Sequence, residues 1–249
     1  MNKQKQCVFD MDSWQLRICV LVFYTLMLLT CPGCGNSDGK AANELAMDSS
    51  EIIRLPEPRY ESEISLEESL LYRRSIRSYS NESLTLQEVS QLLWAAQGIT
   101  DDAGHRTAPS AVALYPLSIY VVAGNVPEIM AGVYIYKPEG NTIERIIDRD
   151  VRNELADAAM GQASVRQGAA SFVVTVDYGK MTARFGDKGE RFGTLEAGHA
   201  AQNLCLQATA LDLGLVTAGA IYDDQVANVL DLPQNLTPLY VIPVGRKIK

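Results

Sequence analysis

The sequence predicts an α+β protein in which a central sheet is flanked by helices. Two helix starts carry capping boxes, Ser65-x-x-Glu68 and Thr85-x-x-Glu88. Residues 170–176 form a continuous, largely β-branched and apolar run, which is typical of an interior strand. Strands and helices alternate without the regular spacing of βαβ units, so a doubly wound parallel sheet is not expected.

Helix caps and apolar periodicity predict the elements in order. The first capping box opens a helix from Leu66 to about Arg74, and the second opens a helix that Gly98 ends, with Leu84 and Val89 placed as a hydrophobic staple. The remaining elements are expected to be strands at 117–123 and 133–136, a helix at 150–159, a strand at 170–176, a helix at 195–213 closed by Gly214, and a strand at 239–244 that Pro243 interrupts.

The composition is that of a globular protein with a core, since 47% of the 249 residues are hydrophobic and 21% are charged. A net charge of −8 argues against nucleic acid as a partner, because a nucleic-acid binder needs a broad basic face. Cys205 is the one cysteine of the predicted domain and is expected in its core. No disulfide framework or metal site can be drawn from the five cysteines.

The N-terminus is expected to direct export. An apolar run at 18–29 follows Arg17, and it is shorter than the roughly 20 residues that span a bilayer. Residues 1–34 therefore predict a signal peptide or lipoprotein-type N-terminus, with Cys31 or Cys34 as the lipid acceptor and Met1 or Met11 as the start. Residues 35–58 are polar and predict a tether, and 59–249 form the domain. An uncleaved anchor at the cytoplasmic face is the alternative.

A cluster of guanidiniums follows the first helix, in Arg73-Arg74-Ser75-Ile76-Arg77. Guanidiniums match phosphate oxygens two at a time, so the cluster suits a phosphomonoester, although a surface charge run would also explain it. Arg246, near the other end of the domain, could complete such a site. Neither a dinucleotide-binding glycine motif nor a P-loop is present, so side chains would hold the phosphate.

Two further segments could contribute to a site. The loop at 108–116 contains two prolines and small residues, so its backbone could approach a flat ligand, with Ser110 as a spare hydrogen-bonding group. The segment 196–204 begins with Glu196-Ala197-Gly198-His199, and its small residues permit close helix contact in the core or across a dimer. Taken singly, the loop could be a plain turn and His199 a satisfied polar group.

Together and in this order, these segments resemble the nitroreductase-like flavoprotein family, most closely its azoline dehydrogenase branch, often called SagB-type. The resemblance spans about residues 70 to 246. The matching pieces are Arg-Arg-Ser-Ile-Arg, the Ala-Pro-Ser-Ala…Leu-Tyr-Pro loop, Phe185-Gly186-x-x-Gly189-x-Arg191-Phe192, Glu196-Ala197-Gly198-His199-x-x-Gln202-Asn203-Leu204 and Pro243-Val244-Gly245-Arg246.

The resemblance implies an FMN-dependent oxidoreductase with a mixed central sheet, working as a homodimer with FMN at the subunit interface. It implies hydride transfer on the flavin, with no catalytic side chain demanded. By position, the residues implied to contact FMN are Arg73, Arg74, Ser75 and Arg246 at the phosphate, Arg77 at the pyrimidine edge of the ring, Ser110, Ala111 and Leu114 packed on the ring, and Gly219 and Ala220 facing the reactive nitrogen through their amides.

Two departures from the family pattern affect the expected substrate. Azoline dehydrogenases commonly carry a Lys-Tyr pair where this chain has Arg184-Phe185, which removes an amine and a phenol that could serve as a base. Val112 replaces a glycine that is usual in the loop. The expected substrate is therefore an undetermined small molecule or peptide, reduced or oxidised with NAD(P)H or another electron carrier. The alternatives are a peptide azoline dehydrogenase and a non-catalytic flavin-binding surface lipoprotein.

Overall fold

The computed structural model describes residues 51–248. The predicted signal or lipoprotein segment at 1–34, with both candidate cysteines, lies outside the described residues, as does most of the predicted tether at 35–58. Within residues 51–248, no helix combines the length and the apolarity that crossing a membrane requires.

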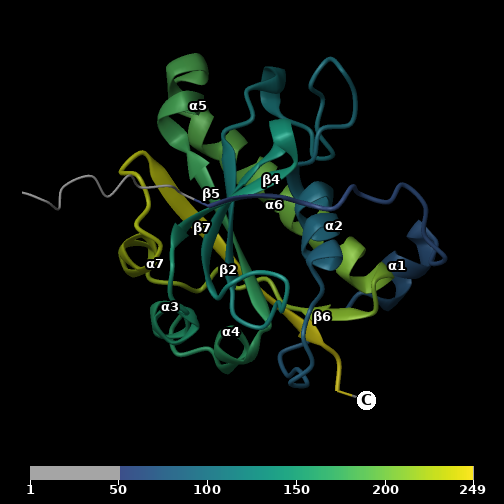
Figure 1. The fold of residues 1–249 in the computed structure, drawn as a ribbon. Coiled ribbons are helices and arrows are strands. Elements are labelled where there is room, and N and C mark those ends of the chain that lie inside the picture. The colour runs from purple at the N-terminus through teal and green to yellow at the C-terminus, as the bar shows by residue number, and fades with distance from the viewer. Residues whose placement is uncertain (1–50, 249) are drawn as a thin grey trace, which may run out of the picture. The chain divides into compact units, whose positions relative to one another are not determined.

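Seven strands form one sheet in the order β1-β4-β3-β2-β5-β7-β6 (Figure 1). Each neighbouring pair is antiparallel, and the one described parallel contact is a short bridge between Ser75 and Leu215. The strands are β1 (Ile52–Arg54), β2 (Leu117–Ala123), β3 (Gly132–Lys137), β4 (Thr142–Ile147), β5 (Ala170–Asp177), β6 (Leu213–Leu215) and β7 (Leu236–Arg246).

Helices cover both faces of the sheet (Figure 1). Leu92 of α2 and Leu204 of α6 belong to the core on one face, whereas Leu155 of α3, Val165 of α4 and Val226 of α7 belong to the core on the other. The helices are α1 (Leu66–Tyr72), α2 (Leu86–Gln97), α3 (Arg152–Ala158), α4 (Ala163–Gln167), α5 (Tyr178–Phe185), α6 (Lys188–Ala210) and α7 (Asp223–Val229).

The predicted α+β class and both capping boxes are confirmed. The Ser65 hydroxyl accepts from the amide of Glu68 at 3.1 Å, and the Glu68 carboxylate accepts from the amide of Ser65 at 3.0 Å. The Thr85 and Glu88 pair repeats this arrangement at the start of α2, which ends at Gly98 as predicted. The strand at 117–123 has the predicted bounds, and β5 lies in the interior of the sheet.

The long helix differs from its prediction at both ends. It begins at Lys188 rather than Leu195, although two glycines lower the helix propensity of this stretch. Those glycines are needed for packing, because an added Cβ would lie 2.6 Å from the backbone of Met181 at Gly189 and 2.9 Å from Val176 at Gly193. The helix ends at Ala210, so Gly214, the predicted end signal, lies in β6 instead.

Pro243 does not interrupt the last strand, contrary to the prediction. It lies inside β7 opposite Ser171, one residue before the pairing of β7 with β6 begins at Val244. The carbonyl of Val244 points toward β5, where it accepts from the amide of Ala169 at 2.9 Å. Successive residues of a strand direct their backbone N–H and C=O groups to opposite sides. Pro243 therefore directs its backbone toward the side on which β6 lies, at a point beyond the end of β6. Its missing N–H removes no hydrogen bond from the sheet.

The fold begins before residue 59, where the sequence places the domain boundary. Ile52 to Arg54 pair with β4, and Leu55 is only 2% exposed. The carbonyl of Pro56 accepts from the Ser90 hydroxyl of α2 at 2.6 Å. Residues 52–54 of the predicted tether are therefore an edge strand, which the few apolar residues of this polar stretch did not signal.

Candidate functional site

Residues 73–79, here called the arginine segment, pack on two paired glycines, Gly214 and Gly245, here called the seat. Gly214 of β6 lies opposite Gly245 of β7 in the sheet register. An added Cβ at Gly214 would lie 2.8 Å from Ile76, and one at Gly245 would lie 2.7 Å from Tyr79. The missing side chains thus let Ile76 and Tyr79 pack directly on the sheet. The amide of Ile76 also donates to the carbonyl of Leu215 at 2.8 Å.

Tyr79 locks this segment in place. Its hydroxyl lies 2.8 Å from the carbonyl oxygen of Ile76 and 3.1 Å from that of Pro243, so it joins the arginine segment to β7. Burial raises the pKa of Tyr79 well above its usual value, although the positive charge of Arg77 acts in the opposite direction. The phenol therefore stays protonated and remains a donor.

The three guanidiniums after α1 differ in their engagement. Arg74 donates to the carbonyls of Leu71 and Arg73, at 3.0 and 2.8 Å, and so caps the end of α1. Arg73 is half-buried and lies near Cys205 of α6. Burial raises the pKa of the Cys205 thiol, and the positive charge of Arg73 acts in the opposite direction with a smaller effect. Within residues 51–248, the guanidiniums of Arg73 and Arg77 have no hydrogen-bond or ion-pair partner. Two charges are thus free to meet an anion.

Arg246 reaches the same end of the sheet but is already paired. Its two terminal nitrogens bind the Glu88 carboxylate at 2.7 and 3.0 Å, and its Nε donates to the carbonyl of Ser83 at 3.2 Å. Glu88 is also the N3 residue of the capping box of α2. The capping motif alone did not reveal that Glu88 binds Arg246 as well. A guanidinium carries five N–H donors, so two remain for a ligand.

The segment with Gly219 and Ala220 runs along the β7 edge of the sheet. Ala218 and Val241 exchange two backbone hydrogen bonds, at 3.0 and 2.9 Å, which fix its position. The carbonyl of Ala220 accepts from Gln162 at 3.2 Å. Gly219 and Ala220 are exposed, and their own amides have no partner among residues 51–248. Two N–H donors are therefore open at this edge.

The loop before β2 holds a strained backbone. Val112, Ala113 and Tyr115 have positive φ values of 49, 55 and 47°. A β-branched residue such as Val112 rarely adopts this conformation, and each such residue costs on the order of 1–3 kcal/mol. The Ser110 hydroxyl accepts from the amide of Tyr115 at 2.8 Å and closes the turn. Strain of this kind persists only where the surrounding structure holds it.

Glu196 lies beneath this loop, and sequence reasoning assigned it no role. It is 3% exposed, and neither carboxylate oxygen forms a hydrogen bond of ordinary geometry with residues 51–248. Burial raises its pKa to about 6, although the nearby Ser110 hydroxyl, Arg106, the Ala111 amide and Lys180 all lower it. Helical spacing could have found it, because Glu196 shares the buried face of α6 with Gly193 and Ala200.

Two cations stand near Glu196 but are bound elsewhere. Arg106 pairs with Glu139 at 3.1 Å, donates to Gln97 at 3.0 Å and lies 4.5 Å from the ring centroid of Tyr115. Lys180 of α5 lies 3.4 Å from the carbonyl oxygen of Tyr115. No ion pair within 4.0 Å joins either cation to Glu196 in the described part of the chain. Both cations therefore contact the loop rather than the carboxylate.

Arg184 and Phe185, at the position of the Lys-Tyr pair expected in azoline dehydrogenases, lie at the end of α5. Arg184 is exposed, and Phe185 packs edge-to-face on Phe192 of α6 with ring centroids 5.0 Å apart. An apolar contact thus occupies the position where azoline dehydrogenases are expected to carry a phenol. Lys180 lies one helical turn before Arg184, so α5 still presents an amine near the loop.

The ten predicted cofactor residues fall into two groups. Arg73, Arg74, Ser75, Arg77 and Arg246 meet around β6 and the end of β7, with Gly219 and Ala220 along the same edge. Ser110, Ala111 and Leu114 lie in the strained loop. Arg73 approaches Cys205 and Ser110 approaches Glu196, and these two positions on α6 are about 13 Å apart along the helix axis.

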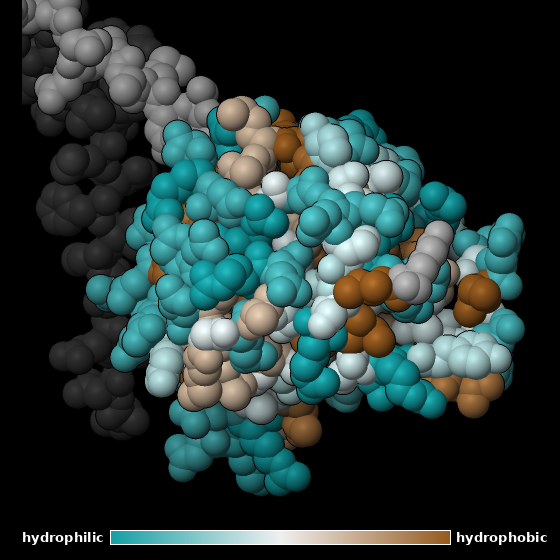
Figure 2. Space-filling view, turned by 90° about the horizontal axis from the view of Figure 1, so that it is seen from below, coloured by the Kyte–Doolittle hydropathy of each residue, from teal (hydrophilic) through white to brown (hydrophobic). Residues whose placement is uncertain are grey.

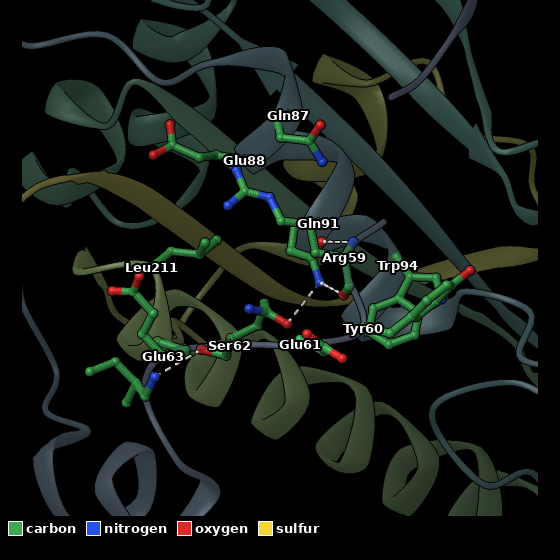
Figure 3. Close-up of a pocket in the computed structure, with 13 residues that line it drawn as sticks. Arg59, Tyr60, Glu61, Ser62, Glu63, Gln87, Glu88, Gln91, Trp94 and Leu211 are labelled. Carbon is green, nitrogen blue, oxygen red and sulfur yellow. Dashed lines mark hydrogen bonds between the residues drawn. The ribbon is translucent and has the colours of Figure 1, made fainter. Parts of the chain in front are cut away.

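One cavity of about 500 Å³ opens between α2, the end of α6 and the segment at 59–64 (Figure 3). Gln91 holds this segment, since it accepts from the amide of Arg59 at 2.7 Å and donates to the carbonyl of Arg59 at 3.0 Å. Tyr60 packs edge-to-face on Trp94 with centroids 5.5 Å apart. None of the ten predicted cofactor residues lines this cavity, although Glu88, which binds Arg246, does.

Comparison with known proteins identifies the family. Residues 70–246 match the model of the nitroreductase family. A nitroreductase-family protein of Methanocaldococcus jannaschii is 44% identical over 197 residues, covering 79% of this chain and 97% of its own. The NADPH-dependent FMN reductase of Bacillus subtilis is 26% identical, covering 72% of this chain and 64% of its own.

Solved structures support the same assignment. The nitroreductase-family structure from Ralstonia eutropha has a TM-score of 0.70 and 28% identity, covering 85% of this chain and 97% of its own. The microcin synthetase complex McbBCD of Escherichia coli, solved with truncated pro-MccB17 bound, shares the fold with a TM-score of 0.63 and 22% identity, covering 98% of this chain and 85% of its own. The expected family is confirmed: this chain belongs to the nitroreductase family.

Proposed function

We propose that the protein is an FMN-dependent oxidoreductase. The observation that carries this proposal is the pair of unpartnered guanidiniums, Arg73 and Arg77, held beside the exposed hydroxyl of Ser75 on a seat built from Gly214 and Gly245. Free guanidinium and hydroxyl donors at one sheet edge fit a phosphomonoester. The flavin oxidoreductases among the relatives support the same cofactor.

The donor set fits FMN residue by residue. Arg73 and Ser75 would hold the phosphate, with Arg74 and the two remaining donors of Arg246 beside them. Arg77, two residues further along, would stand at the pyrimidine edge of the ring, where a fixed cation favours an anionic reduced flavin. The open amides of Gly219 and Ala220 would face an acceptor nitrogen of the ring. Ser110, Ala111 and Leu114 would pack on the ring plane.

Bound FMN would supply the hydride chemistry, and this chain's residues would bind, orient and shield it. The substrate is a small molecule or peptide, and the electron donor is NAD(P)H or another carrier. The supporting argument for an enzyme rather than a binding module is that Arg73 and Arg77 keep unpaired charges. Arg73 is half-buried and Arg77 is exposed, and a degenerate pocket would have little reason to keep an unpaired charge partly buried, as Arg73 is.

A second copy of the chain would complete the site. The two groups of predicted residues lie at different levels of α6, and neither group alone encloses a ligand as flavin sites do. Helix α1, directly before the arginine segment, exposes four large apolar side chains to 54–63%: Leu66, Leu70, Leu71 and Tyr72. Figure 2 shows apolar surface on the side where α1 lies in Figure 1. This unpartnered apolar helix face supports a homodimer with its sites near the interface.

Oxidation of peptide azolines is the second candidate activity. The observation that favours it is Lys180, whose amine lies near the strained loop and could replace the base lost with Arg184-Phe185. Purified protein incubated with a thiazoline-containing peptide and an electron acceptor tests it. Loss of two mass units from the peptide, absent in Lys180→Met, would support this activity, and an unchanged peptide mass would contradict it.

Titration of the purified protein with FMN tests the cofactor. Quenching of flavin fluorescence with one FMN bound per chain is expected, and Arg73→Ala should weaken binding at least tenfold through loss of a charge-assisted phosphate contact. Bleaching of the bound flavin by NAD(P)H in the absence of oxygen would identify the donor. A protein that cannot be loaded with FMN would contradict the proposed function.

We further propose that residues 1–34 attach the protein to the membrane of the cell envelope, through lipid on Cys31 or Cys34. Metabolic labelling with palmitate is expected to mark the wild-type protein, and Cys31→Ser and Cys34→Ser identify the acceptor. Label retained in both single variants and in the double variant would contradict lipidation at these positions. An unlabelled protein in the membrane fraction would favour an uncleaved anchor.

A further inference from the structure

A second cavity, of about 210 Å³, opens where two neighbouring strands separate. The pairing of β2 with β3 ends at Tyr120 and Ile135, although β2 begins at Leu117 and β3 continues to Lys137. The cavity has the volume of roughly seven waters, so it is large enough for a small ligand. It is lined by residues 117–119 and 135–139 together with Gln97, Arg106 and Tyr115, and by none of the ten predicted cofactor residues.

A buried amide without a partner belongs to the lining of this cavity. Gln97 is 1% exposed, and its side-chain oxygen accepts from Arg106 at 3.0 Å. Its Nε2 has no hydrogen-bond partner within residues 51–248. A guanidinium can only donate, so the oxygen of Gln97 must face Arg106 and the two N–H groups of Nε2 are the free ones. Buried donors without an acceptor are costly to the fold, and the cavity is where an acceptor can be supplied.

The same lining includes a cation that is only loosely paired. The side chain of Arg106 is 12% exposed, and its one carboxylate partner in the described part of the chain, Glu139 at 3.1 Å, is 70% exposed. Arg106 uses two of its five N–H groups on Gln97 and Glu139. The Tyr115 hydroxyl accepts from the amide of Arg106 at 3.2 Å, and its own proton is free to be donated. The groups that these side chains leave free are therefore chiefly donors.

Aliphatic side chains contribute another part of the lining. Leu117 and Ile119 are 5% and 1% exposed, and Ile135 is partly buried. They suit a short apolar body, whereas a guanidinium beside further donors suits the two oxygens of a carboxylate. The carboxylate now on Arg106 can give way, because an ion pair with a solvent-exposed partner contributes little.

We propose that this cavity binds a small carboxylic acid with a short aliphatic body. The ligand carboxylate replaces Glu139 on Arg106 and brings an acceptor to the free amide of Gln97. The site is separate from the proposed FMN site, so it does not depend on the proposed function.

Ligand-observed NMR on the full-length protein tests the site, with isovalerate as the probe and isovaleramide as its uncharged match. Saturation transfer from the protein to the methyl groups of isovalerate is expected, and titration gives its Kd. Isovaleramide should bind about tenfold more weakly or worse, because it forms no charge-assisted pair with Arg106. No transfer to isovalerate would mean that the cavity holds water only and would overturn the proposal.

Two carboxylate variants locate the bound probe. Glu139→Gln should tighten isovalerate binding roughly two- to fivefold, because it removes the group that competes for Arg106. Glu51→Gln is the matched control, since Glu51 is an exposed carboxylate paired with a partly buried arginine, Arg145, at 3.2 Å and outside the cavity. It should leave the affinity unchanged. Equal affinities in the wild type and both variants would overturn the proposal.

Arg106→Gln removes the cation itself and should weaken isovalerate binding by about tenfold or more. Arg106 is largely buried, so this variant is read only if its circular dichroism matches that of the wild type. Glu139 is at the surface, and the comparison of Glu139→Gln with Glu51→Gln decides the matter even if Arg106→Gln does not fold.

Titration with and without saturating FMN separates this site from the flavin site. The affinity for isovalerate should be the same in both, since no predicted cofactor residue lines the cavity. Competition between FMN and isovalerate would place the probe at the flavin site and overturn the proposal. If the protein does not bind FMN while isovalerate binding still responds to Glu139→Gln, the proposed function fails and this site stands.

Discussion

Four residues show why single positions in this chain have to be judged by their partners. Within residues 51–248, the guanidiniums of Arg73 and Arg77 have no partner. In contrast, Arg246 donates three hydrogen bonds, two to the Glu88 carboxylate and one to the Ser83 carbonyl. The sequence assigns all three to one cofactor, and only the structure separates a free cation from a paired one. Glu196 was visible in the sequence as part of a motif, but its cost to the fold depends on a loop some 85 positions away.

Removing the charge at Glu196 should stabilise the protein at high pH. Its pKa is raised to about 6 from an ordinary 4.5, so its contribution to stability is complete below pH 4.5 and is lost as the pH rises through 6. Glu196→Gln should therefore unfold like the wild type at pH 4.5 and be more stable by about 2 kcal/mol at pH 8. Denaturant unfolding at both pH values measures this, and an equal difference at both would contradict the pKa shift.

Arg77→Ala should lower the reduction potential of bound flavin. Loss of a cation within a few ångströms of the ring removes about 1–4 kcal/mol of electrostatic stabilisation from the reduced anion, or roughly 20 to 80 mV for a two-electron couple. Arg54→Ala is the matched control, because Arg54 is an exposed arginine of β1 at the opposite edge of the sheet. Potentiometric titration gives the value, and an unchanged potential would place Arg77 away from the ring.

Among the helices and strands, the sequence was sufficient to predict those whose signal is local, namely the helices that begin with a capping box and the strand that is buried in the sheet. Both capping boxes and the interior strand at 170–176 were predictable for that reason. The early start of α6 could not be predicted, because Gly189 and Gly193 lower the helix propensity of that stretch. The sequence alone does not show that these glycines allow close packing against α5 and β5. The seat at Gly214 and Gly245 was equally hidden, since it depends on the register of β6 against β7.

The seat should be sensitive to a single methyl group. In Gly245→Ala the new Cβ would lie 2.7 Å from Tyr79, so the arginine segment must move, at a cost of roughly 1–3 kcal/mol in stability and a loss of FMN affinity. Gly198→Ala is the control, because nothing lies within 4 Å of an added Cβ and helix propensity favours alanine by up to about 1 kcal/mol. Thermal unfolding and FMN titration of both variants check this. Equal stability and equal FMN affinity of the two variants would contradict the packing role of Gly245.

The whole molecule has an apolar face on α1 and a divided set of predicted cofactor residues, and the proposed homodimer would account for both. Leu71→Glu, at a position 60% exposed, should convert the dimer to a monomer and reduce FMN binding with it. Ile52→Lys, at a position 66% exposed on β1, should do neither. Light scattering after size-exclusion chromatography measures the mass. A monomeric wild type that still binds FMN would contradict the shared site.

The resemblance in the sequence and the match to the family model agree over nearly the same residues, so the family could be predicted from the sequence. The substrate could not be, because the motifs describe how a flavin is held and Arg184-Phe185 departs from the branch whose substrate is implied.

The absorbance spectrum of the purified protein is the most direct test of FMN binding. We expect a yellow protein whose flavin is released on denaturation as FMN at one per chain, and we expect the flavin absorbance to be lost in an Arg73→Ala, Arg77→Ala double variant. A colourless protein that gains no flavin absorbance on reconstitution with FMN would contradict it.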